Sequence, residues 1–314
     1  MISLLKNELV KIFSRRLSKI LFLLLLLFSI GTAIVGKMQH TENANWKAAE
    51  EKVITENENR IQLSSLSPQL KADAQNKVKM AKYRLKNQQA PAKINPWSAI
   101  LKVSGLIEMV IILIIIVAAE MVSREFNDGT IKLLLIRPHR RSKILLSKYL
   151  TLAIFSGVAL LLVLVSQFFI NGFLYGFSHL FTTFHSTDLF ISSQGQVVRL
   201  SNISQLVKLY GLSFFSIMNY GTIAFAISTL LRNSALAVGS SLFLMIMGNS
   251  MIEATSKIAW LKYLPFANSD FSLYIYHLAP RPEMTIGFSL MVLIAYMILF
   301  NVISFYSFNK RDII

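Results

Sequence analysis

Two apolar runs decide the fold: residues 100–122, ILKVSGLIEMVIILIIIVAAEMV, and residues 150–170, LTLAIFSGVALLLVLVSQFFI. Each is long enough to cross the hydrocarbon core of a bilayer as a helix, which takes about 20 residues. Between them lies SREFNDGTIKLLLIRPHRRSKILLSKY, residues 123–149, which is basic and much longer than a helical hairpin needs. The stretch therefore predicts two membrane spans joined by a segment with a role of its own.

The composition of the whole chain agrees with a membrane protein. Of its 314 residues, 54% are hydrophobic and 15% are charged, whereas a soluble domain carries about 25% charged residues. A net charge of +16 would suggest nucleic acid on a soluble protein. Here we assign it to loops that fix the topology and face anionic lipid headgroups, and we expect no nucleic-acid partner. The absence of cysteine excludes disulfides, thiolate metal sites and a thiol nucleophile.

The apolar runs predict six spans in one membrane domain, residues 1–314. A helix at 1–16 is amphipathic, with Ile2, Leu5 and Leu9 on one face and Glu8 opposite, and is expected to lie in the membrane interface. Spans are expected at 17–36, 100–122, 150–170, 207–231, 235–252 and 286–308. The first run also resembles a signal peptide, but it is long and lacks an Ala-x-Ala exit, so we treat it as uncleaved. The predicted fold class is an all-α integral membrane protein.

The largest polar segment, residues 38–98, follows the first span. Apolar residues recur at helical spacing in about 41–63 and 68–89, on either side of SSLSP, which predicts an antiparallel helical hairpin. Its excess of lysine and arginine suits either a solvated cap or a surface for an anionic polymer, a lipid headgroup or an acidic peptide. Further external segments are expected at 171–206 and 253–285, and a tail at 309–314.

Lysine and arginine set the predicted orientation. They gather before the first span, within 123–149, at Arg232 and at Lys310 and Arg311. Six spans place these positions on one side, which the positive-inside rule assigns to the cytoplasm. We therefore expect both termini in the cytoplasm and the 38–98 hairpin outside.

The segment 123–149 begins with a predicted helix break. The second span is expected to continue as helix through about residue 126, after which Asp128, Gly129 and Thr130 end it. Glycine accepts unusual backbone dihedrals, and aspartate or threonine can cap the next helix.

A short apolar helix is predicted after this break. The residues TIKLLLIR give about two turns with Ile131, Leu134 and Leu135 apolar, and Pro138 ends them. Such a helix, framed by charges, is suited to a groove in another protein. The alternative is a surface linker that grips anionic headgroups.

The segment resembles the one after the second transmembrane helix of permeases in the ABC-2 family of ABC transporters. The family pattern is Glu-x-x-x-Gly-Thr, an apolar turn, a proline, an arginine and a Ser-Lys pair. It falls here on Glu125, Gly129, Thr130, Pro138, Arg141, Ser147 and Lys148. Residues 263–276, YLPFANSDFSLYIY, are similar to the family's external segment before the last span.

The resemblance implies a coupling helix that docks on a separate ATP-hydrolysing subunit. The implied docking residues are Glu125, Asp128, Gly129, Thr130, Ile131, Leu134, Leu135, Pro138 and Arg141. It also implies two ATPases and a second permease copy, as homodimer or heterodimer, in a bacterial cell membrane. The expected activity is export of an amphipathic or lipid-like substrate, such as an antimicrobial peptide or antibiotic; ions or an envelope lipid or polymer are the alternatives.

The sequence agrees with ATP hydrolysis on a separate subunit. No Gly-x-x-x-x-Gly-Lys-Ser/Thr loop occurs, so ATP and Mg are expected on the partner and no cofactor on this chain. An enzyme is disfavoured because neither His-Glu-x-x-His nor Gly-x-Ser-x-Gly occurs. A metal site at His179, His185 and Asp188 is less simple than a solvated loop, so none is predicted. A non-transporting scaffold is the remaining alternative.

A few polar residues fall within the predicted spans. Glu108 is about ten residues into the second span, near the expected middle of the bilayer, where a charge usually faces a partner or a cavity. It is a candidate for the transport pathway, or an acid that holds two helices together. Asn219, Asn249 and Asn301 are weaker pathway candidates that could instead bond across the bundle.

Overall fold

Six long helices form the body of the molecule. The computed structural model describes residues 1–38, 45–63, 66–102, 105–130, 140–192, 195–231 and 233–310, apart from the side chains of Asn249 and Glu253. The long helices are α2 (Arg16–Met38), α6 (Leu106–Asn127), α8 (Arg141–Tyr175), α10 (Asn202–Leu230), α11 (Ser234–Thr255) and α13 (Ile286–Lys310). Each contains a stretch long and apolar enough to cross a membrane. The prediction of a mainly helical membrane protein with six candidate spans is confirmed.

Two of these helices differ most from their predicted bounds. α8 begins at Arg141 and has 35 residues, which at about 1.5 Å per residue exceeds the ~30 Å hydrocarbon core. It therefore projects beyond the bilayer. The predicted span 100–122 is divided, because Pro96–Lys102 form a separate short helix, α5, and α6 starts at Leu106. α6 continues to Asn127, past the apolar run, as expected.

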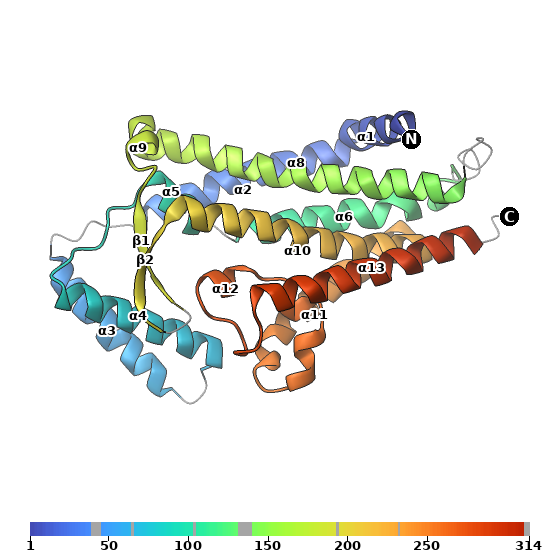
Figure 1. Cartoon of the computed structure of the whole chain (residues 1–314). Coiled ribbons are helices and arrows are strands. Elements are labelled where there is room, and N and C mark those ends of the chain that lie inside the picture. Colours follow the sequence, from blue (N-terminus) through green and yellow to red (C-terminus); the bar gives the residue numbers. More distant parts are fainter. Residues whose placement is uncertain are drawn as a thin grey trace.

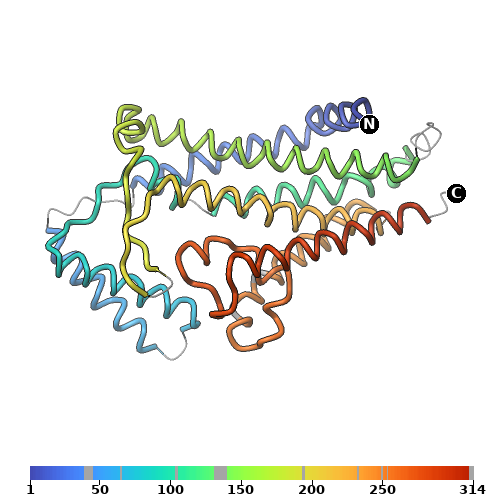
Figure 2. Tube along the Cα trace, viewed as in Figure 1, coloured from blue at the N-terminus to red at the C-terminus, as the bar shows by residue number. Residues whose placement is uncertain are grey.

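Both described ends of the chain lie at the same end of the bundle. Figure 1 shows α1 (Ile2–Ser14) and the C-terminal end of α13 there, together with the C-terminal end of α6 and the start of α8. The polar hairpin lies at the opposite end, as the path of the chain in Figure 2 shows.

The N-terminal helix α1 packs against α8. Its buried residues are Leu4, Glu8 and Ile12, one turn apart, whereas Ile2 is exposed. The expectation that Glu8 lies opposite the packed face is therefore wrong. The acid is buried because it meets a basic partner on α8.

The predicted hairpin in residues 38–98 is present as α3 (Trp46–Gln62) and α4 (Pro68–Lys86). Asn45 caps α3 and Ser67 caps α4 through their side-chain oxygens. Ion pairs from Arg84 to Glu50 at 2.8 Å and from Lys82 to Glu58 at 2.7 Å join the two helices.

The segment 171–206 contains a β-hairpin that was not predicted. Strands β1 (Thr187–Ile191) and β2 (Val197–Ser201) pair antiparallel after the short helix α9 (Phe177–Thr182). Their sequences, TDLFI and VVRLS, do not alternate strictly between apolar and polar residues, so the sequence signal of a strand is weak. Later, three short elements, η1 (Ala259–Tyr263), η2 (Phe266–Asn268) and α12 (Ser272–Ile275), lie between α11 and α13.

The core is centred on the pair α6 and α10, whose backbones approach closely at Gly221. A Cβ added there would lie 2.9 Å from Ile114 Cγ2 and 3.5 Å from Leu152 Cδ2. A larger residue at this position must displace the Ile114 side chain or move α6 away from α10.

We expect Gly221→Val to destabilise the bundle by about 1–3 kcal/mol through overpacking. The thermal unfolding midpoint of the purified protein in detergent measures this. Gly211→Val on the same helix is the matched control, because an added Cβ at Gly211 meets nothing within 4 Å. Equal midpoints for the two variants would contradict close packing at Gly221.

Candidate functional site

Four charged side chains, Glu8, Lys11, Glu125 and Lys148, form an ion cluster where α1, α6 and α8 meet, and all but Lys11 are buried. Lys148, which is 1% exposed, donates to Glu8 Oε2 at 2.9 Å and to Glu125 Oε1 at 2.7 Å. Lys11 also donates to Glu125. Two ammonium groups thus balance two carboxylates at the end of the bundle where both chain ends lie.

The ion cluster is stable only as a complete set. Removing charges from water is costly, and breaking a buried pair leaves an uncompensated charge behind. Glu125 is 2% exposed and holds the centre of the cluster, since both lysines bond its Oε1 atom. The cluster therefore fixes the positions of α1, α6 and α8 relative to one another.

Arg15, which directly follows α1, lies in the same electrostatic environment. Burial lowers its pKa, and the positive charge of Arg124 lowers it further. The carboxylates of Glu120, Glu125 and Glu8 oppose this shift. This end of the bundle therefore holds more charged groups than the four side chains of the ion cluster.

The predicted docking residues divide between this cluster and the surface. Glu125 was expected on the docking surface, whereas the structure buries it within the ion cluster. Asp128 is exposed and pairs with Arg124 at 3.4 Å. Gly129 has a φ of +68°, as a break after α6 requires. Thr130 Oγ1 donates to the carbonyl of Glu125 at 3.5 Å.

The predicted apolar helix with Ile131, Leu134, Leu135 and Pro138 lies outside the described residues. After it, Arg141 begins α8 and its guanidinium donates to the carbonyl of Asn309 at 3.4 Å. The segment between Asp128 and Arg141 is therefore attached on both sides to helices of the bundle.

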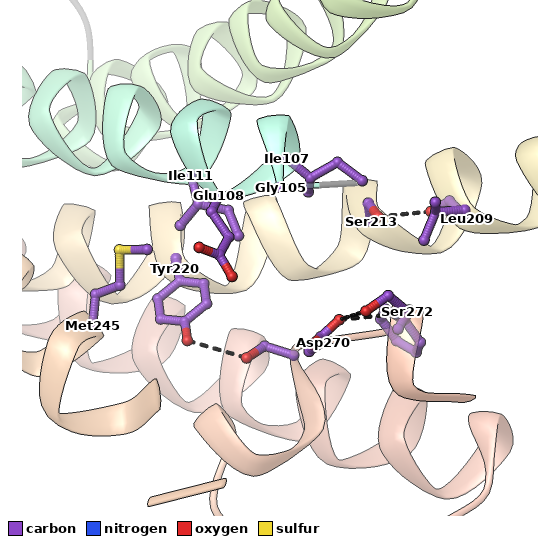
Figure 3. A pocket seen from close by; sticks show the side chains of 12 residues that line it. Gly105, Ile107, Glu108, Ile111, Leu209, Ser213, Tyr220, Met245, Asp270 and Ser272 are labelled. Atoms are coloured by element: carbon purple, nitrogen blue, oxygen red, sulfur yellow. Dashed lines mark hydrogen bonds between the residues drawn. The ribbon is translucent and has the colours of Figure 1, made fainter. Parts of the chain in front are cut away.

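A second candidate site is a cavity of about 100 Å³ beside Glu108. α6, α10, α11 and the residues after η2 enclose it, and the Glu108 carboxylate points toward Tyr220 (Figure 3). Tyr220 Oη bonds Ser269 Oγ at 3.1 Å. Asp270 accepts from the backbone amide of Ser272 at 2.9 Å and lines the same cavity. Two carboxylates and several hydroxyls thus face one small space.

The position of Glu108 differs from the prediction. It lies in the first turn of α6, not near the middle of a span, because α6 begins only at Leu106. It is exposed, and it has no ion-pair or hydrogen-bond partner within the described ranges. Two residues that line the cavity with Glu108, Ser269 and Asp270, lie in the stretch YLPFANSDFSLYIY, which the sequence analysis had singled out without assigning it to a site.

Two of the three asparagines predicted within the spans, Asn219 and Asn301, make no bond to another helix among the residues that the structure describes. Asn219 is fully buried, and neither of its side-chain polar atoms has a partner there. Asn301 donates within its own helix to the carbonyl of Met297 at 2.8 Å. The side chain of Asn249 lies outside the described part. Neither Asn219 nor Asn301 lines the cavity at Glu108.

Metal ligands do not gather in the described part of the chain. No group of three or more histidine and acidic side chains there could hold an ion. His179 lies in α9, whereas Asp188 lies in β1.

The fold and these sites define a multi-pass membrane protein. The chain belongs to the family described as "Protein of unknown function (DUF2705)", which matches residues 75–314. It is 34% identical over 320 residues to "Uncharacterized protein YhcI" of Bacillus subtilis (strain 168), covering 100% of this chain and 99% of that protein. It is 33% identical over 205 residues to "Uncharacterized membrane protein YdbK" of the same organism, covering 64% and 76%.

These comparisons correct the predicted family. The match to the DUF2705 family and to YhcI replaces the predicted membership of the ABC-2 family, which is wrong. The resemblance rested on a short pattern, and two of its residues, Glu125 and Lys148, belong to the ion cluster.

We expect Lys148→Met to destabilise the protein by about 3–5 kcal/mol, because it leaves buried carboxylates without their partner. Adding Glu125→Gln should restore part of this loss by removing one uncompensated charge. Thermal unfolding followed by tryptophan fluorescence in detergent measures both. Lys143→Met, an exposed lysine of the same helix, is the control; a loss as large in this control would argue against the cluster.

Proposed function

We propose that the chain is the membrane-spanning subunit of a transporter, driven by ATP hydrolysis on a separate subunit. The observation that carries the proposal is the ion cluster, which joins α1 to the two helices that flank residues 128–140. A force applied to that segment acts on the C-terminal end of α6 and the start of α8. Because the cluster fixes α1, α6 and α8 together, the three helices would move as one unit.

The cavity at Glu108 supports transport over a passive scaffold. It lies at the other end of α6, between α6, α10 and α11. Motion of the C-terminal end of α6 would therefore change the walls of a polar cavity some four to five turns away, at 3.6 residues per turn. An acid that faces a polar cavity at the end of a span can lie on a substrate or ion path. We propose an amphipathic or lipid-like molecule as the exported substrate.

We infer an ATP-hydrolysing partner because the sequence has no phosphate-binding loop of its own. Without the phosphate-binding loop, ATP and Mg would be held by the second subunit. We propose two ATPase copies and a second copy of this chain, arranged in the bacterial cell membrane. The side that meets the ATPase would be the one with the ion cluster and both termini, which the positive-inside rule places in the cytoplasm.

This orientation predicts the labelling of single cysteines in a chain that has none of its own. A membrane-impermeant maleimide should label Lys52→Cys in intact cells, since that side chain on α3 is 76% exposed. Lys143→Cys, exposed on α8, should be labelled only after the cells are permeabilised. The reverse pattern would place the proposed docking segment outside and exclude the ATPase partner.

Docking of the segment that contains Leu134 and Leu135 on an ATP-hydrolysing partner gives a second prediction. Replacing both Leu134 and Leu135 by Asp would bury charges in the contact, each costing several kcal/mol if desolvated. We expect recovery of the ATP-hydrolysing partner on the purified chain to fall at least about tenfold. The readout is the co-purified chain that contains a phosphate-binding loop, identified by mass spectrometry, together with its ATPase activity.

The control places the same two changes at the other end of the bundle. Leu63 and Leu70 are 53% and 48% exposed on the hairpin, so Leu63→Asp with Leu70→Asp should leave recovery unchanged. Equal recovery from the wild type and the Leu134 and Leu135 variant would mean that the segment is a surface linker.

A further inference from the structure

An apolar groove extends along α2 on the side toward α6. Leu27, Phe28 and Val35 of α2 line it, with Leu106 and Met109 of α6, and it encloses about 850 Å³. Sites for small molecules commonly have about 300–1,000 Å³. The groove is therefore large enough for a ligand, and its apolar lining suits a hydrocarbon chain.

The groove is open to the surroundings of the bundle. Leu27 is 55% and Phe28 46% exposed, although α2 is a span. A Cβ added at Gly31 or Gly36 would meet no heavy atom within 4 Å. Since glycine permits close approach to the backbone, a chain of methylene groups can lie directly against α2.

One positive charge stands at the hairpin end of the groove. Among the described residues that line it, Lys102 alone is charged, and its exposed ammonium has no bonded partner within the described ranges. Glu108 belongs to the cavity beside α10 instead. Lys102 also lines a second cavity of about 670 Å³ beneath the hairpin. An apolar groove thus meets a free ammonium group.

The other charges near Lys102 are mostly neutralised. In the cavity beneath the hairpin, Lys77 pairs with Asp73 at 2.6 Å and Arg84 pairs with Glu50 at 2.8 Å. Asp188 lines that cavity but not the groove. A headgroup at the mouth of the groove would therefore meet Lys102 first.

We propose that this groove binds one anionic phospholipid from the membrane leaflet on the hairpin side. The acyl chains lie along α2, over Gly31 and Gly36, and the phosphate contacts the ammonium of Lys102. The ammonium favours a headgroup with net negative charge over a zwitterionic one, whose choline cation offsets the phosphate. Binding does not depend on the proposed ATP-driven step, since every contact lies on this chain.

Native mass spectrometry of the purified protein, titrated with phosphatidylglycerol or phosphatidylcholine in detergent, tests the site. The wild type should retain one phosphatidylglycerol more tightly than phosphatidylcholine. Lys102→Glu should weaken phosphatidylglycerol retention about tenfold, and Lys102→Arg should preserve it. Gly31→Trp should fill the groove and weaken retention of both lipids.

The control is Lys208→Glu, which changes another exposed lysine, on α10, that lines neither cavity. Equal retention of the two lipids, or an equal loss in Lys208→Glu, would overturn the proposal. Displacement of the lipid by equimolar glycerol phosphate would do so too, because the site would then recognise the headgroup alone. If Gly31→Trp dissociates a dimer and leaves lipid retention unchanged, the groove is a contact between copies and not a lipid site.

Discussion

The contact of Lys148 with Glu8 and Glu125 is the constraint on which the arrangement of the bundle's end depends. An ammonium group that is 1% exposed within a helical membrane protein requires anionic partners. Those partners come from two other helices, so α1 cannot lie free in the interface and α6 cannot end with its last apolar residue. The extension of α6 to Asn127 and the early start of α8 at Arg141 both place a charge where it meets the opposite one.

α6 connects the three features that bear on function. Its C-terminal end supplies Glu125 to the ion cluster, its first turn supplies Glu108 to the polar cavity, and Leu106 and Met109 line the groove along α2. Its central residues are almost completely buried against α10, with Gly221 allowing the close approach. A displacement of this helix would therefore change the ion cluster, the polar cavity and the groove together, as the proposed transport would require.

Hydrophobic periodicity predicted those features of the fold that depend on the length and composition of local segments. The six spans, the helical hairpin and the break at Gly129 follow from local patterns, and the structure contains them. The burial of Glu8 could not be predicted in this way, because it depends on Lys148 far along the chain. The β-hairpin was missed because its strands do not alternate strictly between apolar and polar residues, and Glu108 was misplaced because α5 ends at Lys102 and α6 begins only at Leu106.

The same cluster explains why a short pattern misled the family assignment. Glu125 and Lys148 are 23 residues apart and lie on α6 and α8, at the end of the bundle where α6 ends and α8 begins. Any chain that closes two spans around a polar segment benefits from an acid on the first helix and a base on the second, since each then satisfies the other on burial. A glycine with positive φ after the first helix and a proline before the second have similar local causes. Such residues recur for physical reasons, so their agreement with a family pattern describes how the segment is attached and does not establish descent.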